Sequence, residues 1–204
     1  MSKTRFLVLE GPDKSGKSTQ AALLAESLRA RGLRVLHTRE PGGTSFAEAV
    51  RSVLLDPRHT VCPLAELLLY EAARAQHTEE VIRPALARGE VVLSERYTLA
   101  TLAYQAGGRG LPSSLVRSLN RIATSGLTPD LTLVLDMPDS EFGVRDPSRA
   151  HDRLEQESSA FRRKVRQAYL RLAKSEPHTL LVDSGRDKSA VQAEILEHAL
   201  QALK

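Results

Sequence analysis

Short apolar runs alternate with longer amphipathic stretches along the whole chain. Five runs of five or six residues each contain a short apolar centre, which is typical of buried parallel strands; they cover residues 5–10, 34–38, 90–95, 131–136 and 179–183. Apolar residues at helical spacing predict helices between them, over residues 18–31, 45–55, 64–88 (continuous or broken), 113–125, 154–174 and 187–203. The alternation predicts an α/β fold: a five-stranded parallel sheet with helices on both faces.

The length and composition favour one intracellular domain. No linker, repeat or low-complexity tract divides the 204 residues, so we expect residues 1–204 to form a single domain. Cys62 is the sole cysteine and no apolar run is long enough to span a membrane. The net charge of +4 is offset along most helices by acidic residues, which argues against a nucleic-acid-binding face. We therefore expect a cytoplasmic protein that binds neither nucleic acid nor membrane.

The most informative motif directly follows the first apolar run. Residues 11–19 fit the phosphate-loop pattern G-x-x-x-x-G-K-[ST]. In this pattern the glycines let backbone N–H groups point inward, the lysine reaches the outer phosphates, and the following hydroxyl joins the Mg²⁺ shell, while the next helix adds its positive N-terminal end. The motif predicts nucleoside triphosphate binding by Gly11, Pro12, Asp13, Lys14, Ser15, Gly16, Lys17, Ser18 and Thr19.

A second basic segment lies between the fourth strand and the following helix. Residues 143–153 are rich in arginine and turn residues and predict a mobile lid. Arginine can hold phosphate oxygens at two points, so Arg145, Arg149 and Arg153 are candidates for binding a phosphoryl group during transfer. Most other arginines are expected on solvated helix faces, among them Arg162, Arg163 and Arg171.

Four segments in order resemble the motifs of the thymidylate kinase family, and the resemblance covers essentially the whole chain. They are residues 11–19, 38–44, 95–97 with 103–105, and 152–157. The resemblance implies a P-loop kinase fold and transfer of the terminal phosphate of ATP to dTMP, in the supply of dTTP. It also implies Mg²⁺ as cofactor and a homodimer.

The acceptor phosphate needs cations rather than a base. A nucleoside monophosphate presents oxygens that are already ionised, so the enzyme must align the reactants and stabilise charge. Arg96, at the end of the third predicted strand, is placed to hold this phosphate. Arg39, Glu40 and Pro41 lie in a glycine-containing loop where the backbone can approach a ligand closely. The sequence does not decide whether the bond before Pro41 is cis.

The resemblance also assigns roles around the nucleoside. It implies that Asp13 contacts the sugar 3′-hydroxyl, that Tyr70 stacks on thymine and that Arg74, four residues further on the same helix face, reaches a base carbonyl. Tyr104 is implied to press against the sugar where a 2′-hydroxyl would stand, and Gln105 to bond to the base. The residues expected to act in catalysis are Lys14, Lys17, Arg96, Arg149 and Arg153.

Glu95 carries the main ambiguity. The family usually has aspartate here, and we expect Glu95 to serve Mg²⁺ with Ser18, directly or through water. In a deoxynucleoside kinase Glu95 would instead be the general base for a sugar hydroxyl, and in an ATPase switch it would activate water. The segments 39–43 and 104–105 oppose the first alternative. The six histidines show no metal-ligand spacing.

Overall fold

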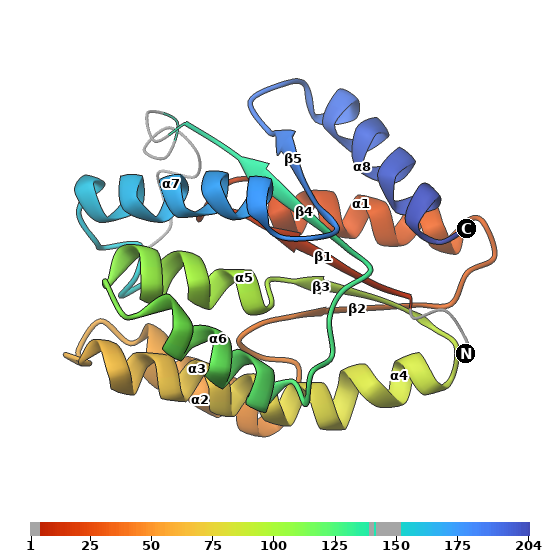
Figure 1. Cartoon of the computed structure of the whole chain (residues 1–204). Helices are drawn as coiled ribbons and strands as arrows, with labels where there is room; N and C mark the ends of the chain where they lie inside the picture. The colour runs from red at the N-terminus through yellow and green to blue at the C-terminus, as the bar shows by residue number, and fades with distance from the viewer. Residues whose placement is uncertain (1–4, 139–140, 142–151) are drawn as a thin grey trace.

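The central feature of the fold is a five-stranded, wholly parallel sheet (Figure 1). The computed structural model describes residues 5–138, 141 and 152–204. The strand order is β2-β3-β1-β4-β5, so the strand that leads into the phosphate loop lies in the middle. The strands are β1 Phe6–Glu10, β2 Val35–Arg39, β3 Val91–Glu95, β4 Leu131–Asp136 and β5 Thr179–Asp183.

Helices cover both faces of the sheet. On one face, Leu7 and Leu9 of β1 pack in a cluster with α1 (Lys17–Arg29) and α8 (Lys188–Ala202). The alternate residues Phe6 and Val8 face the other side, as the two-residue period of a strand requires. The elements on that side are α2 Ser45–Leu55, α3 Pro63–His77, a π-helix Thr78–Ile82, α4 Arg83–Ala87, α5 Thr98–Thr101, a π-helix Leu102–Gly108, α6 Ser113–Ala123 and α7 Ser159–Ser175.

The five predicted strands, the parallel sheet and the α/β class are confirmed, with strand ends within one residue of those predicted. The predicted helix 64–88 is interrupted by a π-helical turn. A helical segment at 98–108 was not predicted. No described helix is long and apolar enough to cross a bilayer.

The predicted start of the helix 154–174 is wrong. The Asp152 carboxylate accepts hydrogen bonds from the backbone N–H groups of Leu154 and Glu155, both at 2.9 Å. This local bonding holds the chain in a turn. The helix begins at Ser159, because the Ser158 hydroxyl accepts from the N–H of Phe161 at 3.1 Å and caps it.

Candidate active site

The phosphate loop joins the central strand to α1 at the carboxyl end of the sheet. Gly11 has φ 136°, and a Cβ there would lie 2.3 Å from the carbonyl oxygen of Leu135, so the loop passes against β4 in a way that only glycine permits. Gly16 is left-handed, with φ 89°, and forms the N-cap of α1. The loop backbone therefore has the curl that the motif predicts, and it sits at the edge where ligands of parallel sheets bind.

Lys17 closes this loop from inside. Its Nζ donates to the carbonyl oxygens of Pro12 at 2.6 Å and Gly11 at 3.1 Å. Burial and the nearby charge of Arg96 lower the pKa of Lys17 to about 7. Phosphate oxygens placed in the loop would favour the ammonium form. Lys14 also has left-handed backbone, with φ 61°, an unusual conformation for a residue with a side chain.

Ser18 and Glu95 stand side by side at the mouth of the loop. The Ser18 hydroxyl donates to Glu95 Oε2 at 2.5 Å, and His37 Nε2 lies 3.0 Å from Glu95 Oε1. Burial alone would raise the pKa of Glu95, but the hydrogen bonds from His37 and Ser18 outweigh it, so the pKa is lowered. The ionised carboxylate of Glu95 and the hydroxyl of Ser18 thus lie next to each other in the cleft.

These two oxygen ligands fit Mg²⁺. Among the described residues no group of three or more His, Cys, Asp or Glu side chains could hold a metal ion. Mg²⁺ does not need such a group, because it is usually held by one or two protein oxygens together with water and substrate phosphates. Ser18 and Glu95 both line the cleft beside the loop.

Arg96 connects the phosphate loop to α7 and to the π-helix Leu102–Gly108. Its backbone is left-handed, with φ 69°, and its guanidinium donates to the Gly11 carbonyl at 2.9 Å and to the Tyr169 hydroxyl at 3.0 Å. It also forms an ion pair with Asp13, which accepts from the Tyr104 hydroxyl at 2.8 Å. Burial would raise the pKa of Asp13, but the charge of Arg96 outweighs it and the pKa is lowered.

Glu10 supports this arrangement from below. The side chain is fully buried and accepts from the backbone N–H groups of Tyr97 at 2.8 Å and Ala100 at 3.1 Å. Its other oxygen accepts from the Tyr169 hydroxyl at 2.9 Å. Burial raises the pKa of Glu10, although Arg96 partly offsets this. Glu10 thus fixes the turn that carries Arg96 against the phosphate loop.

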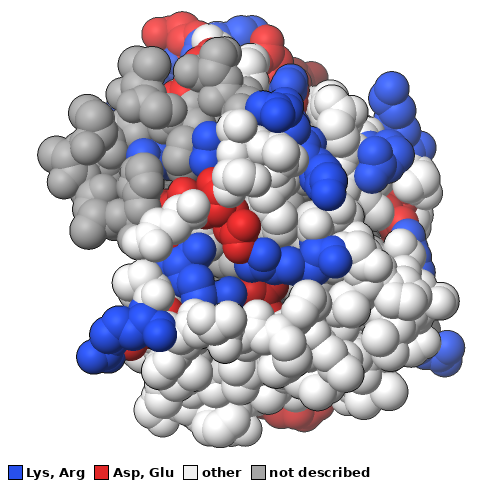
Figure 2. Space-filling view, turned by 90° about the vertical axis from the view of Figure 1, so that its left-hand side faces the viewer, with Lys and Arg blue, Asp and Glu red and all other residues white. Residues whose placement is uncertain are grey.

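An open cleft and a narrower pocket meet at Asp13 and Arg96, which line both. The cleft also holds Lys14, Lys17 and Arg39. Figure 2 looks onto this end of the molecule and shows acidic and basic side chains gathered in a hollow. The pocket, of about 450 Å³ including its mouth, is lined by Leu55, Tyr70, Ala100, Thr101, Tyr104 and Gln105 among others.

The loop after β2 exposes one predicted site residue, Arg39, and buries the next, Glu40. Arg39 is exposed and pairs with Glu48 at 3.1 Å. The Glu40–Pro41 bond is cis, and Glu40 is buried with its carboxylate turned to Arg74 at 2.8 Å. Burial would raise the pKa of Glu40, but Arg74 outweighs it and the pKa is lowered. Glu40 nevertheless lines both the cleft and the pocket, so contact of this residue with substrate stays a prediction.

Arg74 lies behind the pocket wall. It is 1% exposed, and its guanidinium bonds Glu71 and Asn120, each at 2.8 Å, and the Tyr97 carbonyl at 2.9 Å, besides Glu40. These contacts fix α3 against α6 and against the residues that follow β3. Contact of Arg74 with a base carbonyl stays a prediction, since the residues lining the pocket do not include it.

The structure places Arg153 against α2 and α3, and its contact with the reacting phosphate stays a prediction. Its guanidinium donates to the Leu54 carbonyl at 2.7 Å and pairs with Glu66 at 2.7 Å, and its backbone N–H donates to the Leu55 carbonyl at 3.1 Å. Arg153 thus anchors the chain to α2 and α3. Residues 143–151 of the predicted lid 143–153, Arg145 and Arg149 among them, lie outside the described residues.

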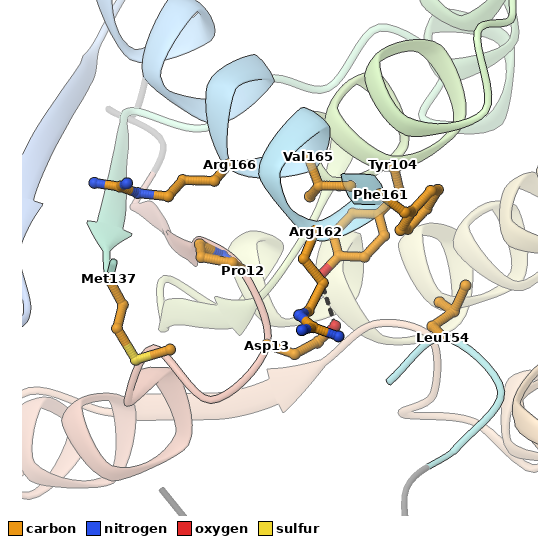
Figure 3. A pocket seen from close by; sticks show the side chains of 9 residues that line it. All are labelled: Pro12, Asp13, Tyr104, Met137, Leu154, Phe161, Arg162, Val165 and Arg166. Atoms are coloured by element: carbon orange, nitrogen blue, oxygen red, sulfur yellow. Dashed lines mark hydrogen bonds between the residues drawn. The ribbon is translucent and has the colours of Figure 1, made fainter. Parts of the chain in front are cut away.

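The helix α7 contributes side chains that the sequence interpretation missed. Figure 3 shows Phe161, Arg162 and Val165 of this helix facing Pro12 and Asp13 of the phosphate loop. Arg162, expected on a solvated helix face, is half-buried and lines this pocket. Its position, one residue after a buried aromatic residue on an amphipathic helix, gave no sign of this.

Other contributors were also missed. Arg51 lines both cavities and donates to the Pro41 carbonyl at 2.9 Å; as one arginine on a predicted helix it gave no local sign of this. His37, which bonds Glu95, had a sequence signal, because it lies on the strand that leads into the loop with Arg39. The role of Tyr169, whose hydroxyl bonds Arg96 and Glu10, was hidden within a stripe of core residues.

The fold and the site together define a P-loop kinase that phosphorylates a nucleoside monophosphate. A family model described as thymidylate kinase matches residues 9–195. The chain is similar to the thymidylate kinases of Deinococcus radiodurans (50% identity over 198 residues, 96% of each chain) and Pseudomonas syringae pv. tomato (52% over 194 residues, 93% of this chain and 92% of the relative).

A solved structure agrees with these sequence matches. The crystal structure of thymidylate kinase from Ehrlichia chaffeensis superposes with a TM-score of 0.80 at 33% identity, covering 97% of this chain and 98% of that one. The chain therefore belongs to the thymidylate kinase family, and its activity is ATP-dependent phosphorylation of dTMP to dTDP. The comparisons do not support the two alternative hypotheses, a deoxynucleoside kinase and an ATPase switch.

Proposed function

We propose that ATP occupies the phosphate-loop cleft and dTMP the adjoining pocket, so that the γ-phosphate of ATP meets the phosphate of dTMP beside Arg96. The observation that carries this placement is the Asp13–Arg96 ion pair, which forms part of the wall of both cavities. Donor and acceptor phosphates are both anionic and must be brought together. A cation at the junction of their sites reduces that repulsion.

The residues of the loop and cleft divide the phosphate chemistry. The loop residues 11–19 bind the triphosphate through backbone N–H groups, and Lys17 stabilises charge on the transferred group. Arg96 and Arg39 hold the acceptor phosphate, which needs no general base. Two further cations approach the transferred group in this proposal: Lys14 of the phosphate loop and Arg149 of the predicted lid, residues 143–153.

The pocket residues recognise the nucleoside. Tyr70 forms a flat apolar wall for thymine, and Gln105 supplies a hydrogen bond to the base. Asp13, held between Arg96 and Tyr104, accepts a hydrogen bond from the sugar 3′-hydroxyl. Tyr104 is 6% exposed and fixed through its hydroxyl, so it restricts the space where a 2′-hydroxyl would stand.

Mg²⁺ is the proposed cofactor. Ser18 and Glu95 would hold it, because their oxygens lie together at the mouth of the loop. When bound, the ion neutralises charge on the phosphate oxygens. Glu95 then has no proton to remove, in agreement with an acceptor that is already ionised.

A homodimer is supported by an apolar surface on two neighbouring helices. Phe46 and Val53 of α2 and Leu64 and Leu68 of α3 are each between 45% and 49% exposed. Large apolar side chains gathered on one face mark an interaction surface, and a second copy of the same chain is the simplest occupant. We retain the single domain 1–204 and the cytoplasmic location as parts of this proposal.

A coupled assay of ADP release across nucleoside monophosphates tests the proposed function. We expect dTMP to be the best acceptor and dUMP to be weaker by about 10- to 200-fold at most, because a lost methyl contact costs only about 1–3 kcal/mol. Purine monophosphates should be very poor, since the pocket is shaped for one pyrimidine. Equal rates with AMP or CMP would contradict the proposal.

A further inference from the structure

A buried carboxylate fixes the amide of Gln105. Gln105 Nε2 donates to Glu66 Oε1 at 2.8 Å, and the two residues are 1% and 0% exposed. Gln105 lies in the π-helix Leu102–Gly108, whereas Glu66 lies in the first turns of α3. Two elements that are far apart in the sequence thus meet at this hydrogen bond.

The charge on Glu66 decides which way the amide turns. The carboxylate also accepts from Arg109 at 3.0 and 3.1 Å and pairs with Arg153 at 2.7 Å. Burial would raise the pKa of Glu66, but the hydrogen bonds from Arg109 and Gln105 outweigh it, and the pKa is lowered. An ionised carboxylate can only accept hydrogen bonds, so it must face the NH₂ group of Gln105. The amide oxygen is then on the other side.

The Gln105 oxygen is the group left for a ligand. Gln105 lines the nucleoside pocket with Tyr70, Thr101 and Tyr104. Among the described residues no donor bonds to Gln105 Oε1, whereas its Nε2 is engaged. A glutamine amide can usually offer either a donor or an acceptor by rotating. Here the rotation would place oxygen against carboxylate oxygen, so the amide oxygen stays on the side away from Glu66.

We propose that Glu66 is a positioning residue that presents Gln105 as a hydrogen-bond acceptor, and that this selects pyrimidines with a hydrogen on N3. The inference rests on the proposed placement of dTMP in this pocket. Thymine and uracil carry N3–H, a donor that matches the amide oxygen. In cytosine N3 is an acceptor, so the oxygen and the ring nitrogen would repel and both would lose their hydrogen bonds to water.

The parent enzyme can be tested with 5-methyl-dCMP, which keeps the methyl group and sugar of dTMP. We expect its kcat/KM to be at least about 100-fold below that of dTMP, and also below that of dUMP, because a site built for a hydrogen bond rejects an analogue that cannot make it. Turnover of 5-methyl-dCMP equal to that of dUMP would overturn this inference alone. Absence of turnover with dTMP would instead overturn the proposed function.

A matched pair of variants tests the part played by Glu66. In Glu66→Gln the new amide can donate to Gln105 Oε1, which frees the NH₂ of Gln105 to face cytosine N3. We expect the ratio of kcat/KM for dTMP to that for 5-methyl-dCMP to fall at least about tenfold. The control Glu157→Gln removes the other carboxylate bound to Arg109 and should keep the parental ratio. Equal loss in both variants would show that Arg109, not Glu66, orients the amide.

A second substitution keeps the test open if Glu66→Gln does not fold. Gln105→Met retains the length of the side chain and removes the amide, so the ratio should fall toward that of a pocket without this hydrogen bond. A parental ratio in folded Gln105→Met would overturn the inference. A change of stability without a change of base preference would have the same meaning, because a purely structural residue would not move this ratio.

Discussion

His37 Nε2 lies 3.0 Å from Glu95 Oε1, between neighbouring strands of the sheet. The other oxygen of Glu95 accepts from Ser18 of the phosphate loop. The carboxylate is therefore held from two sides, by β2 and by the loop that binds the triphosphate. Its position depends on the length of the glutamate side chain.

Glu95→Asp should keep measurable turnover, whereas Glu95→Gln should lose much more. Aspartate retains the charge but is one methylene shorter, so it can reach only one of the two partners, His37 or Ser18. Glutamine loses the charge, and raised Mg²⁺ should partly restore its activity. Turnover of dTMP measured across a Mg²⁺ series checks this.

Thymidine as acceptor is the control for the same two variants. The parent should leave thymidine unphosphorylated, because we propose that Glu95 serves Mg²⁺ and does not act as a general base. Phosphorylation of thymidine that disappears in Glu95→Gln at every Mg²⁺ concentration would contradict this role.

Lys17→Ala should lower kcat by about 10²-fold or more, because it removes a charge aimed at the phosphoryl group in transfer. Circular dichroism and the melting temperature should show that the fold is retained. Near-parental turnover would mean that the loop binds ATP without contributing to transfer.

Lys14→Ala and Arg149→Ala should each retain partial activity, since both cations are proposed to approach one transferred phosphate. The double variant should then differ from the sum of the single effects. A double-mutant cycle on kcat measures this coupling. Strict additivity would show that one of the two side chains never meets the phosphate.

Arg153→Ala should mainly destabilise the protein. The loss leaves the Leu54 carbonyl and Glu66 short of a partner, at a cost of about 1–3 kcal/mol. Urea unfolding should detect the change, and kcat should fall far less than in Arg149→Ala. An unchanged free energy of unfolding combined with a hundredfold loss of kcat would return Arg153 to the reacting phosphate.

The stability difference between the parent and Glu66→Gln should depend on pH. The pKa of Glu66 is lowered in the folded protein, so its ionised form stabilises the fold fully above the unfolded value of about 4.5 and progressively less as pH falls below it. The variant lacks this contribution at every pH. The difference in the free energy of unfolding between parent and variant should be larger at pH 7 than at pH 4. An equal difference at both pH values would show that the charge of Glu66 does not stabilise the fold.

Local patterns were sufficient to predict the sheet and the phosphate loop. The three central strands are apolar and buried almost throughout, and the positive φ angles at Gly11 and Gly16 meet a local backbone requirement of the loop. By contrast, the burial of Arg74 and Glu40 was not predicted. It depends on contacts between α3, α6 and the loop after β2, which no short pattern contains.

Capping and long-range pairing account for the remaining errors. The start of α7 was misplaced because the Asp152 turn precedes the true cap at Ser158. Glu66 escaped notice because its partners Gln105 and Arg153 lie far along the chain. A single acidic residue on a helix gives no sign of such a hub.

The π-helix Leu102–Gly108 has a consequence for comparing relatives of this chain. An α-helix with the same end points needs one residue fewer per wide turn, so a one-residue deletion at the start of this segment would leave the packing of α6 and α7 almost intact. Only the residues between the deletion and the end of the segment would rotate, by about 100°, and Gln105 among them would turn away from Glu66. A single-residue gap at this point of an alignment would therefore mark a change in which base is recognised, even where the surrounding residues are the same.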